Sequence, residues 1–68
     1  MRINFDPKAD AIRIKFQEGE YEVSKEVDDG VILDMTKDDK IMAIEILDVS
    51  EKLPLKALRN ITIGIADS

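Results

Sequence analysis

The stretch DMTKDDKIMAIE, from Asp34 to Glu45, has oxygen-bearing side chains at the spacing of a calcium loop. EF-hand loops place ligands at their first, third, fifth and twelfth positions, which here include Thr36 and Asp38. The sixth position should be glycine but is Asp39, and both flanks alternate like strands rather than helices. We therefore interpret the stretch as a hairpin with a polar tip. Asp34 and Glu45 stay open as an outward-facing acidic pair.

A second acidic pair, Asp6 and Asp10, lies at the two ends of DPKAD, the first segment that the sequence predicts as a turn. Aspartate beside proline in such a turn usually accepts hydrogen bonds from turn amides, and we favour that interpretation. The alternative is acid–base work or the binding of a divalent cation. The candidate metal ligands, if there is a metal at all, are Asp6, Asp10, Asp34 and Glu45. An enzyme that uses only carboxylates is a third hypothesis, but a chain this small offers little room for the cleft that such chemistry needs. We predict no enzyme, no catalytic residue and no cofactor.

Composition narrows the function classes further. The 68 residues predict a single small domain, 1–68. The absence of cysteine and histidine excludes disulfides, cysteine-based zinc sites and histidine triads, so any metal would be a hard cation held by oxygen. The formal net charge of −5 disfavours nucleic acid and suits a basic protein partner or solubility. There is no membrane-length apolar run and no secretory signal, which predicts a cytoplasmic protein with no membrane contact.

Alternating apolar residues dominate the first two-thirds of the chain and predict half-buried strands. In the first hairpin, the alternation pairs Phe5 with Ile12 across the proline turn. In the second, it pairs Phe16 with Tyr21 across a two-residue Glu18-Gly19 loop. Successive hairpins of this kind predict an antiparallel meander.

Two further hairpins complete the predicted meander of five strands. The third pairs Val27 with Val31, with Gly30 as the left-handed residue of a three-residue loop. This register also sets Lys25 against Leu33, its one poor match. For the fourth, one face carries the pairs Met35/Met42, Leu33/Ile44 and Val31/Ile46, and the other face carries Thr36/Ile41, Asp34/Ala43 and Ile32/Glu45.

The pattern changes after Asp48. A short helix is predicted over 54–59, with Ser50 as a plausible N-cap ahead of it. A sixth strand is predicted over 61–65, with its partner left open between this sheet and another subunit. The predicted fold class is therefore α+β: a five-stranded antiparallel meander, a short helix and a C-terminal strand.

Several apolar residues fall on the face opposite the predicted core. If the helix covers one face, the second face is a contact surface, although a curled sheet could bury both. Our leading hypothesis is a non-enzymatic module that binds a protein or forms a homodimer, with strand addition at a sheet edge as one mode. The candidate interface residues are Ile32, Ile41, Leu47, Ile61, Ile63 and Ile65.

Three segments together resemble the YuzE-like family of small prokaryotic proteins: FDPKADAIRIKF, EVDDGVILDMTKDDK and IEILDVS. The chain departs from the family at Asp39 and Ala43, where members often have glycine, and the first departure suggests a differently shaped turn tip. The resemblance implies an antiparallel α+β fold and no established activity, so no site residue is carried over. Members are sometimes encoded beside toxin-like proteins, which implies an antitoxin-like role with a small basic partner.

Overall fold

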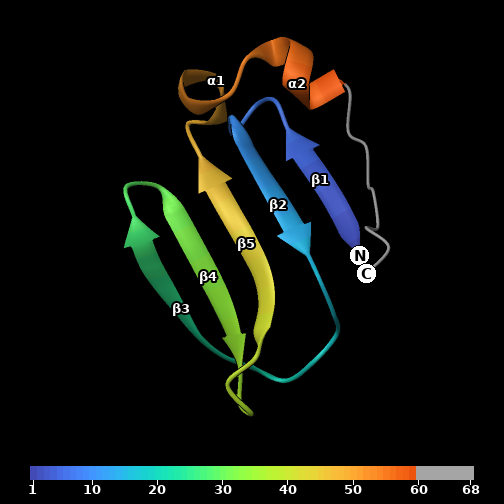
Figure 1. Ribbon diagram of the computed structural model, residues 1–68, viewed down its shortest axis with the longest axis vertical. Helices are drawn as coiled ribbons and strands as arrows, with labels where there is room; N and C mark the ends of the chain where they lie inside the picture. The colour runs from blue at the N-terminus through green and yellow to red at the C-terminus, as the bar shows by residue number, and fades with distance from the viewer. Residues whose placement is uncertain (60–68) are drawn as a thin grey trace, which may run out of the picture.

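The computed structural model describes residues 1–59 as one twisted antiparallel sheet with two short helices at one end (Figure 1). Its extents are 36 × 33 × 18 Å, so the molecule is a broad, thin slab. The elements are β1 (Arg2–Asp6), β2 (Ala11–Lys15), β3 (Tyr21–Asp28), β4 (Val31–Thr36), β5 (Ile41–Leu47), α1 (Val49–Lys52) and α2 (Leu55–Arg59).

The strand order is β1-β2-β5-β4-β3, and this corrects the predicted meander. The hairpin that would pair Phe16 with Tyr21 does not form, because β2 pairs with β5 instead. After β2 the chain crosses one end of the sheet and enters β3 at the far edge (Figure 1). Apolar β5 takes the centre, where Ile44 and Ile46 face Ile14 and Ile12. The strongly charged β3 takes an edge, where charged side chains are tolerated.

The predicted β1–β2 register is confirmed, with Phe5 opposite Ile12. In the β4–β5 hairpin, the predicted pairs Leu33/Ile44, Val31/Ile46, Asp34/Ala43 and Ile32/Glu45 are also confirmed. A register shift after Asp34 makes the Met35/Met42 and Thr36/Ile41 pairs wrong, because Met35 faces Ile41. Met42 becomes the extra residue of a bulge, and its side chain is buried.

The β3–β4 hairpin contains two irregularities, one at each end of β3. Lys25 faces Leu33 as predicted, but the second irregularity puts Asp28, and not Val27, opposite Val31. Gly30 has the predicted positive φ, at 68°. A Cβ there would lie at an ordinary contact distance of 3.4 Å from Leu47 and would displace only the flexible end of Lys52, so the positive φ is what favours glycine.

The predicted helix over 54–59 is confirmed as α2, one residue shorter. Ser50 is not an N-cap, since it lies inside α1, and the N-cap position belongs to Asp48 in a left-handed conformation. The predicted strand over 61–65 lies outside the described residues.

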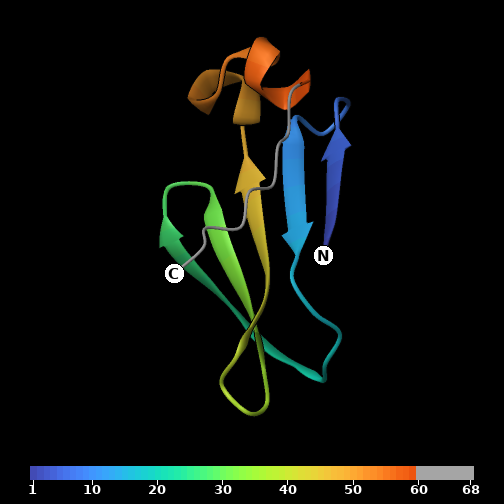
Figure 2. The ribbon, with the colours of Figure 1, turned by 45° about the vertical axis from the view of Figure 1, so that its right-hand side comes forward.

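The core is small. The buried apolar residues are Ile12, Met42, Ala43 and Val49. The helices lie beyond one end of the sheet rather than across either face (Figure 2). The rest of the apolar sheet surface is therefore only partly covered by residues 1–59.

Candidate functional site

One sheet surface, here named the apolar face, is built almost entirely from aliphatic residues. The strand registers place on it Ile3, Phe5, Ile12, Ile14, Val31, Leu33, Met35, Ile44 and Ile46. Of these only Ile12 is fully buried, at 6% exposure. The others are half-buried or exposed, so water reaches much of a continuous apolar surface.

The opposite surface, here named the polar face, centres on Asp34, whose exposure is only 4%. Ser24 Oγ donates a hydrogen bond of 2.6 Å to Asp34 Oδ1, and Arg13 Nη2 donates one of 3.3 Å to Oδ2. The Tyr21 hydroxyl lies 2.9 Å from Ser24 Oγ, which extends the network to the edge strand. Side chains from β2 and β3 thus converge on one carboxylate of β4.

Glu45 lies beside Asp34, and the two carboxyl groups titrate in opposite directions. Burial would raise the pKa of Asp34, but hydrogen bonds from Ser24, Glu45 and Arg13 outweigh it and leave that pKa lowered. Burial and the neighbouring Asp34 raise the pKa of Glu45. Asp34 is thus the group that stays ionised, and Glu45 is the one that takes up the proton first.

The four candidate metal ligands do not converge: Asp34 and Glu45 are neighbours, whereas Asp6 and Asp10 each have other partners. Asp6 Oδ1 accepts hydrogen bonds from the turn amides of Lys8 and Ala9, at 3.0 and 3.3 Å, as the turn signal predicted. Asp10 instead accepts from the backbone N and hydroxyl of Ser50, at 3.1 and 2.6 Å, and so fastens α1 to the first turn. Within residues 1–59, no three acidic side chains are grouped to hold a metal ion.

Side-chain oxygen atoms at the tip of the β4–β5 hairpin form hydrogen bonds within the tip itself. Thr36 is buried; its Oγ1 donates to Asp38 Oδ1 at 2.5 Å and accepts from the Lys40 backbone N at 3.1 Å. This bond from Thr36 lowers the pKa of Asp38. Asp39 has a φ of 63°, in the left-handed region that glycine adopts without strain and that aspartate tolerates in turns. Sequence reasoning assigned Thr36 only to the tip and missed its role as the tip's organising residue.

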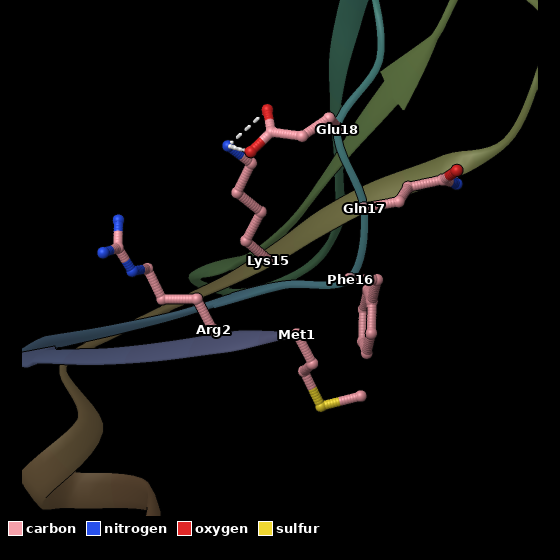
Figure 3. Close-up of a pocket in the computed structure, with 6 residues that line it drawn as sticks. All are labelled: Met1, Arg2, Lys15, Phe16, Gln17 and Glu18. Atoms are coloured by element: carbon pink, nitrogen blue, oxygen red, sulfur yellow. Dashed lines mark hydrogen bonds and ion pairs between the residues drawn. The ribbon is translucent and has the colours of Figure 1, made fainter.

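Shallow hollows open on the surface of the described residues, and two of them adjoin the segment from Gln17 to Glu20. The first, of about 340 Å³, lies at the start of β1 and the end of β2. Figure 3 shows Lys15 and Glu18 joined as an ion pair on one side, at 2.7 Å, and Met1 and Phe16 on the other. The second, of about 330 Å³, lies between residues 17–20 and 36–38. Neither hollow is lined by Asp34 or Glu45.

The candidate interface residues are spread over both faces. Ile32 and Leu47 lie on the polar face by register, half-buried and 39% exposed respectively. Ile41 is 42% exposed and lies opposite Met35, beside the bulge. The other three candidates, at 61, 63 and 65, lie outside the described residues. Across residues 1–59, no helix is long and apolar enough to cross a membrane.

Comparison with known proteins identifies a family without assigning a role. Residues 2–50 match the family described as protein of unknown function DUF2283. Neither the curated proteins nor the solved structures gave a significant match. The matched region contains all five strands and the beginning of α1, and therefore both faces described above. The chain belongs to the DUF2283 family of proteins of unknown function.

Proposed function

We propose that this protein is a non-enzymatic interaction module whose apolar face binds another protein surface. The observation that carries the proposal is the apolar face itself, which has no second layer within residues 1–59. A sheet with one apolar side is normally buried against a helix layer or another sheet. A contiguous exposed apolar surface of this kind is typical of a binding site.

The sheet edges are less suited to binding than the face. β3 is one edge strand, and its irregularities, together with Lys25 pointing toward the apolar side, disrupt a flat pairing surface. β1, the other edge, has five residues and is followed by Pro7. Bulges, charges and short length are common ways of protecting edges from pairing. These features support contact through the face rather than strand addition.

The arrangement of the polar face disfavours acid–base catalysis and so supports a binding role for the protein. Its carboxyl pair lies on an open sheet surface, whereas acid–base catalysis needs a cleft that holds a substrate against the carboxyl group. In the described part of the chain, no buried side-chain nitrogen or oxygen lacks a hydrogen-bond partner. The polar face is thus complete without a ligand, and the cation-binding alternative gains no support from it.

The net charge of −5 supports a basic protein as one class of partner. The small toxin-like protein implied by the YuzE-like resemblance is a member of that class. Such a partner would place its own apolar residues on the face and its basic residues against acidic side chains elsewhere on the surface.

The test uses two neighbouring residues of β4. Leu33 and Ile32 are both half-buried and aliphatic, but they point to opposite faces. A photoreactive phenylalanine analogue is placed at either position in the full chain, which is then irradiated in the host cell. We expect a covalent adduct of discrete mass from position 33 only, with the partner identified by mass spectrometry. Absence of an adduct at 33, or equal adducts at 32 and 33, would overturn the proposal.

A further inference from the structure

We infer that the partner on the apolar face is a second copy of this chain, stacked face to face as a two-layered β-sandwich. This inference rests on the proposed function and names its partner. Each copy would supply one five-stranded sheet, and the two apolar faces would form a common core.

The apolar face extends from β1 to β4, a width of four strands. No helix or strand of residues 1–59 forms a layer over it (Figure 2). A second copy of the chain would supply a layer of matching width, because it carries the same four strands.

A second copy fits the charge distribution in spite of the acidic composition. The residues that define the apolar face carry no charge. By register, Lys25 and Asp28 of β3 lie at its rim, opposite Leu33 and Val31. Each copy thus brings an uncharged surface whose rim holds one cation and one anion. The acidic pair Asp34 and Glu45 lies on the other side of each sheet and would face outward.

The geometry also limits association to two copies. Four strands of five to seven residues, spaced ~4.8 Å apart, give the apolar face a patch of roughly 20 × 20 Å, and a second copy would cover all of it. A symmetric face-to-face contact uses the same surface on both chains and is closed. The outer surfaces of the pair would be the two polar faces, which have no apolar layer to attract a third copy.

The test is sedimentation equilibrium of the purified full chain over a range of micromolar concentrations. We expect twice the monomer mass of 7.7 kDa. Leu33→Glu should raise the dimer dissociation constant about a hundredfold or more, because it buries an unpaired charge in the contact. Ile32→Glu, on the opposite face of the same strand, should leave the dimer intact. Circular dichroism reports whether each variant folds.

A second measurement needs no variant. The melting temperature of a dimer rises with protein concentration, since association stabilises the folded state by mass action. A monomer whose melting temperature does not depend on concentration would overturn the inference. So would a dimer that Ile32→Glu dissociates and Leu33→Glu does not. If the chain is monomeric but position 33 cross-links to a different protein, the second copy is wrong and the proposed function stands; with no adduct either, both are wrong.

Discussion

The two faces of the sheet differ in how far their side chains are shielded from water, and two adjacent residues of β4 show the difference. Asp34, a charged residue, is 4% exposed because Ser24 and Arg13 enclose it. Leu33, an aliphatic residue, is only half-buried, and the helices of residues 1–59 lie beyond the end of the sheet instead of over its face (Figure 2). Residues 1–59 thus complete the polar face with their own side chains and leave the apolar face only partly covered. For Asp34 and Leu33, the degree of burial depends more on the neighbouring side chains than on whether the residue is polar or apolar.

The largest expected effect comes from the one fully buried residue of the apolar face. Ile12→Ala should lower the free energy of unfolding by about 3 kcal/mol, since it removes buried methylene groups and leaves a cavity. Urea unfolding at fixed protein concentration measures the loss. The control is Leu47→Ala on the polar face, where the side chain is 39% exposed and the loss should be much smaller. Equal losses would show that the two faces do not differ in how they hold the fold.

The next effect tests whether the polar face is held together by Asp34. Asp34→Ala should cost about 2 kcal/mol, because Ser24 and Arg13 lose a charged hydrogen-bond acceptor. Ser24→Ala, which removes only one of these bonds, should cost about half as much. Thermal melts at neutral pH provide the comparison. No loss of stability with Asp34→Ala would mean that the network around this carboxylate does not stabilise the fold.

A smaller effect should depend on pH. The pKa of Glu45 is raised in the folded state, so its carboxylate destabilises the fold at pH values above that pKa. Glu45→Gln should therefore melt at a higher temperature than the natural chain at pH 7. The advantage should shrink as the pH falls through the raised pKa of Glu45, where the natural chain becomes protonated.

The control for this pH dependence is Asp34→Asn. The lowered pKa of Asp34 stabilises the fold above the unfolded-state pKa, and this contribution is lost as the pH falls through the folded-state pKa. The variant should therefore be less stable than the natural chain at pH 7, the reverse of Glu45→Gln. Parallel behaviour of the two variants would contradict the opposite titration of this pair.

The smallest effect is expected at the exposed ion pair of Lys15 and Glu18. Lys15 lowers the pKa of Glu18, mainly through their hydrogen bond, but the Glu18 side chain is fully accessible to solvent and salt. Glu18→Gln should leave the melting temperature unchanged within error, at low and at high salt. A shift as large as that of Glu45→Gln would show that this hollow matters to the fold.

The local part of the fold could be predicted from the sequence. Alternation located the five strands, and matching of apolar side chains set Phe5 against Ile12 and Leu33 against Ile44 correctly. The bulge that displaces Met42 could not be predicted, because its neighbours Ile41 and Ala43 are apolar too and either register buries aliphatic groups.

The order of the strands was wrong for a different reason. The Glu18-Gly19 signal suggested a tight turn, whereas the contact that decides the order joins β2 to β5, distant in the sequence. For the site, sequence reasoning found Asp34 and Glu45 as an acidic pair but not the partners Arg13 and Ser24. Arg13 depends on that same distant pairing. Ser24, by contrast, already lies opposite Asp34 in the predicted β3–β4 register, and its hydroxyl was overlooked as a donor to that carboxylate.

The β2–β5 pairing also has a consequence during synthesis on the ribosome. The β1–β2 hairpin emerges first, yet its inner neighbour β5 is the last of the five described strands to leave the exit tunnel. Until then the nascent chain carries an aliphatic hairpin with one unpaired inner edge, next to a second, incomplete hairpin. Contacts between distant segments form slowly, and open strand edges in the meantime favour aggregation. The timing of β5, more than the propensity of any single strand, should set how safely this small protein reaches its native state.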